Sequence, residues 1–212
     1  MTLQLVIGDK PISSWSLRGA LALELTGAPY TEQLVMLNRP DTRARLIEHS
    51  PTGKVPVLKT EQGPIWDSLA IGEYLAETFP EAHLWPRGQY PRAVARAVCA
   101  EMHSGFSALR THLPMDLKRD QALEPLPAEQ QALVQADLQR LFALWSECRT
   151  AFGEDGPFLF GLPSLADAFF APVASRLRSY RVELPALIAA YVETIYQWPA
   201  FARWYQAAQA SA

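Results

Sequence analysis

The pattern of apolar and polar positions changes character near residue 80. Before that point, short apolar runs alternate with segments in which apolar residues recur every three or four positions. Short apolar runs suit buried strands, and a repeat near 3.6 residues suits an amphipathic helix. The first 80 residues therefore predict one small α/β domain with the element order βαβαββα. The expected strands are residues 3–7, 30–37, 55–58 and 65–66, with a turn at 63–64, and the expected helices are residues 13–26, 41–49 and 68–79.

Beyond residue 90 the strand pattern disappears and long amphipathic segments take its place. Residues 81–90 are rich in proline and lack periodicity, so we expect a linker there. Ser164 and Asp167 have the spacing of a capping box, in which each side chain satisfies a backbone N–H at the start of a helix. Residues 91–212 therefore predict an all-helical domain. Its expected helices are residues 92–113, 128–152 with Leu133, Leu138, Leu141, Leu144 and Trp145 on the apolar face, one from 164, and two that begin after Pro185 and Trp198.

Composition narrows the class of protein. The 212 residues are 49% hydrophobic and 19% charged, which is typical of soluble globular proteins with one large or two small domains. A net charge of −3 gives no reason to expect nucleic acid or an anionic membrane as a partner. No apolar run is long enough to cross a bilayer, and the first residues lack the features of a signal peptide, so we expect a cytoplasmic protein. The two cysteines are far apart and no His/Cys cluster has zinc spacing, so we expect neither a disulfide nor a metal site.

Candidate chemistry begins at Val55–Pro56, where a proline interrupts a strand pattern. Proline cannot donate to a sheet ladder, so inside a strand it marks an edge, a first residue or a special site. The peptide bond before a proline also adopts the cis form at modest cost. We expect Val55–Pro56 to be cis, with the N–H and C=O of Val55 turned out of the sheet towards the backbone of a ligand.

Asp67 and Ser68 follow one strand later and open the next helix. Helix starts carry free N–H groups, so a carboxylate and a hydroxyl there suit a zwitterion, with its amine on Asp67 and its carboxylate on Ser68 and the amides. Lys54 adds a cation for a second carboxylate at the flank of this site. Each feature alone has an ordinary structural explanation, as an edge-strand proline or a helix cap. Together they fit a small peptide.

The segments that carry these features resemble those of the cytosolic glutathione transferases. Residues 53–58 (GKVPVL) and 67–71 (DSLAI) are similar to the glutathione-binding half of that family. Residues 157–161 and 164–168 are similar to the capping box ahead of the central helix of its C-terminal domain. The resemblance covers essentially the whole chain and implies a homodimer. The implied parts are a thioredoxin-like glutathione-binding domain (1–80), a linker (81–90) and an all-helical domain (91–212).

The resemblance also implies a ligand and the residues that hold it. Glutathione is the expected co-substrate, with no metal. The glutathione-binding residues are expected to be Lys54, which would hold the glycine carboxylate, together with Val55, Pro56, Asp67 and Ser68.

Residues 13–18 (SSWSLR) stand at the start of the first helix, directly after the first strand. Glutathione chemistry needs the thiolate, and a thiol with a pKa of about 8.5 is only slightly ionised at neutral pH. A hydroxyl donor and a helix N-terminus together lower that pKa. The pattern resembles the serine-type transferases, above all the zeta class, which implies Ser13 as the donor to the sulfur and Ser14 as the alternative. Arg18 is expected to anchor this loop, to add positive potential, or to form a structural salt bridge.

Trp15 stands where the zeta pattern has a cysteine. This difference argues against maleylacetoacetate isomerase activity and against a thioltransferase, which needs a cysteine at this helix start. By resemblance, an electrophile site lies between the domains, and Trp15 is expected either to line it or to pack in the domain interface. The other expected lining residues are Met102, His103, Phe106 and Arg110, of which Met102 and Phe106 suit the core better.

The sequence thus predicts a cytosolic glutathione transferase of the serine type, nearest to zeta-like bacterial members, that acts in detoxification. It would transfer glutathione to a small electrophile. Glutathione-dependent isomerases, dehalogenases and peroxidases use the same thiolate and are alternatives. A non-catalytic binding module of the same fold is a second alternative, and a redox thioltransferase is a third.

Overall fold

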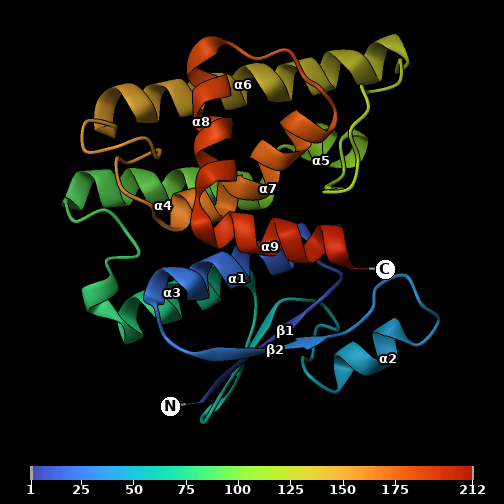
Figure 1. Ribbon diagram of the computed structural model, residues 1–212, viewed down its shortest axis with the longest axis vertical. Helices are drawn as coiled ribbons and strands as arrows, with labels where there is room; N and C mark the ends of the chain where they lie inside the picture. The colour runs from blue at the N-terminus through green and yellow to red at the C-terminus, as the bar shows by residue number, and fades with distance from the viewer. Residues whose placement is uncertain (1, 212) are drawn as a thin grey trace.

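The structure is a computed structural model that describes residues 2–211 of the chain. A mixed β-sheet with its own helices forms one layer, and a helical domain stacks on it (Figure 1). The strands are β1 (Leu3–Ile7), β2 (Tyr30–Leu34), β3 (Val57–Thr60) and β4 (Gly63–Ile65). The helices are α1 (Ser14–Thr26), α2 (Thr42–Ile47), α3 (Ser68–Thr78), the 3₁₀ helix η1 (Pro80–Ala82), α4 (Gln89–Ser104), α5 (Ser107–His112), α6 (Ala128–Phe152), α7 (Leu165–Ser179), α8 (Ala186–Gln197) and α9 (Pro199–Ala210).

The sheet has the thioredoxin-like arrangement, with strand order β2-β1-β3-β4 among the described residues. Strand β1 runs parallel to β2 and antiparallel to β3, and β3 pairs antiparallel with β4. Side chains alternate along a strand, so β1 serves two cores. Leu3, Leu5 and Ile7 pack in the core that includes α1 and α3, whereas Val6 packs with Leu46 of α2 on the opposite face. The predicted βαβαββα order is confirmed.

Three strands have boundaries that differ from the sequence prediction. Strand β2 ends at Leu34 rather than residue 37, because its partner β1 ends at the paired residue Ile7. Strand β3 begins only at Val57, which faces Val6, so the preceding cis-proline lies beyond the ladder. Strand β4 includes the glycine and proline of the expected turn. Because β4 is an edge strand, the N–H that Pro64 lacks is tolerated there.

The helix expected over residues 92–113 is two helices, α4 and α5. The chain breaks at Gly105 and Phe106, and Phe106 adopts a left-handed conformation with φ of 55°. A Cβ on Gly105 would lie 2.8 Å from the carbonyl oxygen of Glu101, so a larger residue does not fit this break. Helix α4 also starts at Gln89, three residues before the predicted start and inside the expected linker, which also holds part of η1.

Helix α6 has the predicted bounds, and four of the five residues predicted for its apolar face are buried. Leu133 was expected to be buried, yet it is 55% exposed. Its neighbour Val134 turns inward instead, because Val134 and not Leu133 lies three to four residues before the buried Leu138 and seven before Leu141.

Helix α7 is the centre of the helical domain and packs against α1, α4 and α8. Phe169 and Phe170 are fully buried along it. The predicted capping box is confirmed, since Ser164 caps α7 and Asp167 reaches back to it. Asp167 is itself fully buried and accepts hydrogen bonds from the N–H of Ser164 (2.8 Å), the N–H of Leu159 (3.1 Å) and the hydroxyls of Ser164 (3.0 Å) and Tyr191 (2.9 Å). Burial raises the pKa of Asp167 to about 6.

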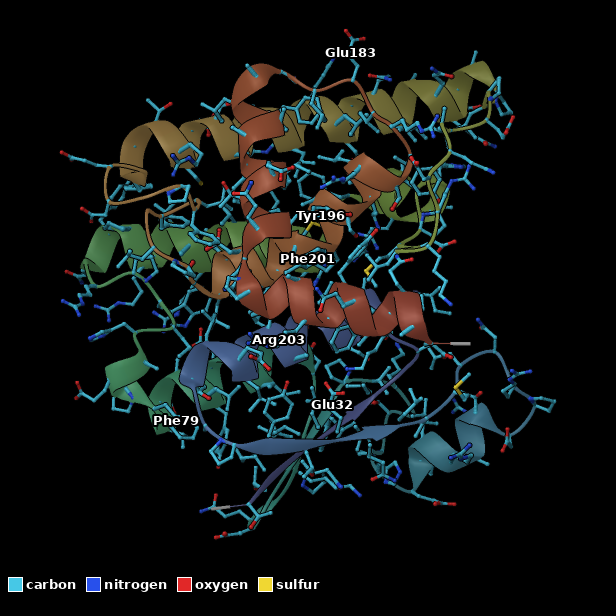
Figure 2. All side chains as sticks on the ribbon, in the orientation of Figure 1. Glu32, Phe79, Glu183, Tyr196, Phe201 and Arg203 are labelled. Atoms are coloured by element: carbon cyan, nitrogen blue, oxygen red, sulfur yellow. The ribbon has the colours of Figure 1, made fainter. Side chains whose placement is uncertain are left out.

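Polar contacts join the helical domain to α1 and to the loop before it. Arg203 of α9, labelled in Figure 2, forms an ion pair with Glu24 of α1. The indole N–H of Trp204 donates to the carbonyl of Lys10 at 3.0 Å. Figure 2 also shows Tyr196 and Phe201 near the junction of α8 and α9, where their rings meet edge to face at 4.9 Å. The two domains therefore share one continuous interface.

No helix in residues 2–211 combines the length and the apolar character that crossing a membrane requires.

We expect Asp167→Asn to lower the free energy of unfolding by about 2–4 kcal/mol, because an amide replaces an acceptor on which four donors converge. Ser164→Ala, which removes the hydroxyl but keeps the carboxylate, should cost about 1 kcal/mol. Urea denaturation of both variants followed by circular dichroism gives the comparison. Equal losses for the two would show that the buried carboxylate adds nothing beyond the cap.

Candidate active site

A cavity of about 400 Å³ lies where the loop before β3, the start of α3, the start of α1 and the end of α4 meet. This volume lies in the range of small-molecule sites. A larger cavity, of about 690 Å³, is found between β2, the loop before α1 and the end of α9, and it contains none of the predicted site residues. The smaller cavity is lined by Trp15, Thr52, Lys54, Val55, Pro56, Trp66, Asp67, Ser68 and His103. All five predicted glutathione-binding residues therefore lie together.

The loop before β3 contributes a backbone segment and a cation. The Val55–Pro56 peptide bond is cis, as expected. Within residues 2–211, no main-chain hydrogen bond involves Val55, so both its N–H and its C=O are available. Lys54 is exposed and has no carboxylate partner in the described part of the chain. Gly19 of α1 lets this loop approach closely, since a Cβ there would lie 3.1 Å from Pro56.

The start of α3 contributes an acid and a hydroxyl. Asp67 is the N-cap of α3, and its Oδ1 accepts from the N–H groups of Leu69 (2.9 Å) and Ala70 (3.3 Å). Its other oxygen, Oδ2, lies 3.0 Å from Nε2 of His103. Ser68 is 1% exposed, and no residue among 2–211 pairs with its hydroxyl. A polar ligand group would therefore find an unpaired hydroxyl beside a fixed carboxylate.

Helix α1 begins at the serine cluster, and its first serines differ in their bonding. Ser13 is the N-cap, and its Oγ donates to Oγ of Ser16 at 2.7 Å while accepting the N–H of Ser16 at 3.4 Å. Oγ of Ser16 in turn accepts the N–H of Gly8 at 2.9 Å. The hydroxyl of Ser14 and the N–H of Trp15 have no hydrogen-bond partner within the described chain. Neither Ser13 nor Ser14 is among the residues that line the cavity, although the adjacent Trp15 is.

Trp15 connects the cavity to a buried arginine. Its ring lies 5.0 Å from the ring of His103 and 4.3 Å from the guanidinium of Arg18. Trp15 thus lines the cavity and packs against His103 of the helical domain, whereas its part in an electrophile site stays a prediction. Arg18 is 1% exposed, with Phe169 at 5.0 Å, and its three guanidinium nitrogens meet no acceptor among the described residues. The structural salt bridge that was one expectation for Arg18 is therefore wrong.

Arg18 belongs to a cluster of three arginines that surrounds the start of α1. Arg176 of α7 is 4% exposed with two unpartnered nitrogens, and Arg110 of α5 lies 5.6 Å from Trp15. Burial, followed by the charge of Arg176, lowers the pKa of Arg18 to about 9, and burial with Arg110 lowers the pKa of Arg176 to about 10. The cluster concentrates positive charge beside the cavity. Sequence reasoning missed Arg176, because an arginine in the last turn of a helix is usually solvated.

The expected electrophile-binding residues divide into two groups. Met102 and Phe106 lie in the hydrophobic core and do not line the cavity, because α4 turns Met102 towards the core and the break after it carries Phe106 inward. His103 lines the cavity, and Arg110 donates to its carbonyl at 3.2 Å. They come from two helices rather than from one stripe.

Metal-binding groups and reactive cysteines are two further kinds of site that the described residues could contain. Among residues 2–211, no group of three or more His, Cys, Asp or Glu side chains is placed to hold a metal ion. Cys99 and Cys148 are free and buried, and burial raises the pKa of both thiols.

A thioredoxin-like domain with a cis-proline cavity, followed by an all-helical domain, defines the class of fold. Family models give the family. Residues 12–78 match the model of the glutathione S-transferase N-terminal domain, and residues 131–207 match that of the glutathione S-transferase C-terminal domain. The two matches together cover more than half of the chain. The chain therefore belongs to the glutathione S-transferase family, as its sequence resemblance predicted.

Relatives of this chain include proteins named maleylacetoacetate isomerase. A probable maleylacetoacetate isomerase of Caenorhabditis elegans is 38% identical over 97 residues, 46% of this chain and 45% of that protein. The maleylacetoacetate isomerase of Rhizobium meliloti (strain 1021) is 37% identical over 108 residues, 49% of this chain and 51% of that protein. The chain thus spans about half the length of the curated relatives it matches. The solved structure of a bacterial zeta-class maleyl pyruvate isomerase aligns over the full length of both chains, with a TM-score of 0.75 and 25% identity.

We expect Arg18→Met to raise the free energy of unfolding by about 1–3 kcal/mol at pH 7.5, because it removes a buried charge that no acid in the described chain compensates. Between about pH 9 and 12, Arg18 keeps its proton in the unfolded chain but releases it in the folded chain. The free energy of unfolding of the wild type therefore rises with pH in this range, and the stability advantage of Arg18→Met becomes smaller. Urea denaturation at pH 7.5 and pH 10 measures both effects. The exposed Arg43→Met serves as a control and should change stability by less than about 0.5 kcal/mol. A loss of stability in Arg18→Met at pH 7.5 would contradict the absence of a partner.

Proposed function

We propose that the protein is a cytoplasmic glutathione transferase, which binds glutathione in the 400 Å³ cavity and presents its thiolate to a small electrophile between the domains. One observation carries the proposal. The cavity combines a free ammonium group, an open backbone segment, an unpaired hydroxyl and a fixed carboxylate, which are the partners that a zwitterionic tripeptide requires.

Each end of glutathione has a partner in this arrangement. Lys54 would hold the glycine carboxylate, and the N–H and C=O of Val55 would pair with the cysteinyl backbone. Ser68 and the N–H groups at the start of α3 would take the γ-glutamyl carboxylate. Asp67 would accept its amine through Oδ2, since Oδ1 already caps the helix. A glutathione transferase homologue from Burkholderia with bound glutathione has the same fold, at a TM-score of 0.74 and 22% identity.

The sulfur would lie at the start of α1, where three groups favour a thiolate. The N–H of Trp15 is unpaired among the described residues, and the helix N-terminus carries partial positive charge. We propose Ser13 as the hydroxyl donor, with Ser14 as the alternative. Oγ of Ser16 lies 2.7 Å from Oγ of Ser13 and can become the donor in that pair, which would release the Ser13 proton for the sulfur.

Calorimetric titration with glutathione tests the proposal. We expect binding by the wild type and a loss of about 5–30-fold in affinity for Lys54→Ala, because an ammonium–carboxylate hydrogen bond disappears. Lys59→Ala is a matched control, since this lysine stands on β3 and does not line the cavity. A wild type that binds no glutathione would refute the function. An unchanged affinity in Lys54→Ala would mean that another residue binds the glycine carboxylate.

Thiolate absorbance of the bound complex, titrated against pH, tests the serine. Ser13→Ala should raise the pKa of the bound thiol by about one to two units, the equivalent of about 1.5–3 kcal/mol for a hydrogen bond to a charged acceptor. Ser14→Ala should shift it much less. The opposite result would exchange the two roles, and no shift in either variant would favour a binding module over an enzyme.

A second candidate is glutathione-dependent cis–trans isomerisation of a carboxylate-bearing substrate. The relatives named maleylacetoacetate isomerase suggest it, and the cluster of Arg18, Arg110 and Arg176 favours it, because buried positive charge beside the cavity suits an anionic electrophile. The thiolate would add to the cis double bond, the new single bond would rotate, and the thiolate would leave. Trp15, in place of the zeta cysteine, keeps this candidate second.

Absorbance assays with maleylacetoacetate and with a generic aryl halide, each with glutathione, separate the two candidates. Isomerisation that Arg110→Met slows by 10-fold or more would favour the isomerase. A rate no higher than that of glutathione alone would exclude it.

We also propose a homodimer through the later elements of the first domain and the first helices of the second. A groove between α4 and α6 is lined by apolar side chains together with Glu101, Arg140 and Glu147, and the lining residue Tyr90 is 72% exposed. Sedimentation at micromolar concentration distinguishes a dimer from a monomer.

A further inference from the structure

His103 is the residue through which the helical domain enters the glutathione cavity. It stands near the end of α4, and its Nε2 lies 3.0 Å from Oδ2 of Asp67, the N-cap of α3. Sequence reasoning assigned His103 to the electrophile site. The structure places its ring against the carboxylate that faces the peptide cavity.

We propose that His103 is a positioning residue for the amine of glutathione: it fixes the Asp67 carboxylate in the orientation that receives this amine. The inference rests on the proposed function. It assigns to the helical domain a part in binding the peptide, in addition to any part in binding the electrophile.

The bonding of Asp67 supports this role. Backbone N–H groups of α3 hold Oδ1, and His103 holds Oδ2, so both oxygens are fixed although the side chain is 52% exposed. Without His103, Oδ2 would have no protein partner among the described residues and could rotate into solvent. An ordered carboxylate binds an ammonium group better than a mobile one, because less side-chain entropy is lost on binding.

The histidine is itself held in place. Trp15 meets its ring edge to face at 5.0 Å and 75°, and Phe169 lies at 6.4 Å on the side of α7. These contacts come from two helices, α1 and α7, and fix the direction of the Nε2–H bond. The ring is therefore a rigid donor rather than a mobile surface group.

The hydrogen-bonding pattern makes His103 a donor to Asp67. An ionised carboxylate only accepts, so Nε2 carries the proton in this pair. Nδ1 is buried and has no hydrogen-bond partner among residues 2–211. Each carboxylate oxygen has more than one lone pair, so the ammonium group of glutathione binds as a further partner and does not need to displace the histidine.

Attachment of the two domains does not depend on this contact. Arg96 of α4 forms an ion pair with Glu73 of α3 at 2.8 Å, and the indole of Trp85 donates to the same carboxylate at 3.2 Å. His103→Phe keeps a flat ring for Trp15 and Phe169 and removes only the donor. His103→Gln keeps an N–H donor of similar reach.

The experiment compares two ligands by calorimetric titration: glutathione, and glutaryl-cysteinylglycine, which is the same peptide without the amine. We expect His103→Phe to lower the affinity for glutathione by about 5–20-fold and the affinity for the amine-free peptide by less than about 2-fold. His103→Gln should recover most of the affinity for glutathione. His112→Phe, on α5 and away from the cavity, should leave both affinities unchanged.

Three outcomes would overturn the inference. Equal losses for both ligands would mean that His103 only supports the interface. An unchanged affinity of His103→Phe for glutathione would mean that Asp67 needs no partner. A wild type that binds neither peptide would refute the proposed function, and the role of His103 with it, whereas the first two outcomes leave the proposed function intact.

Discussion

Helix α1 is buried on two sides, and the arrangement of both domains depends on it. One side packs on the sheet, where Gly19 lies against Leu5 of β1, and the other side packs against α7 of the helical domain. A helix in this position must be apolar nearly all round, and most of α1 is buried. Because its start carries the serine cluster and its Gly19 meets Pro56, the same packing sets the geometry of the cavity.

The burial of α1 also explains its arginine. Arg18 lies in the second turn of a helix enclosed by two layers, so its guanidinium cannot reach water and rests on aromatic faces instead. Arg176 and Arg110 approach the same region from α7 and α5. A soluble protein rarely retains uncompensated buried charge without a use for it. This charge lies beside the cavity through Trp15, where it can act on a ligand.

Both domains contribute residues to the cavity. The first domain supplies the peptide-facing groups from two loops close together in sequence, and the second supplies His103 across the interface. The first contribution depends on contacts within one domain. The second depends on how α4 lies against α3.

Features that depend on residues close together in the sequence could be predicted from the sequence alone. These are the βαβαββα order, the capping box of Ser164 and Asp167, the cis bond at Val55–Pro56, and the pairing of Asp67 and Ser68 at one helix start. Each depends on neighbours within a few residues, where propensities and backbone constraints act directly. The five residues expected to bind glutathione are neighbours of this kind, and the structure brings all five to one cavity.

Features that depend on residues distant in sequence could be seen only in the folded structure. Three such features follow from how the helices pack against one another. They are the break at Gly105 and Phe106, the exposure of Leu133, and the lack of a partner for Arg18 among residues 2–211. Arg176 joins the cluster from more than 150 residues away in sequence, and His103 meets Asp67 across 36 positions. Such contacts follow from the packing of whole elements, which a local pattern does not encode.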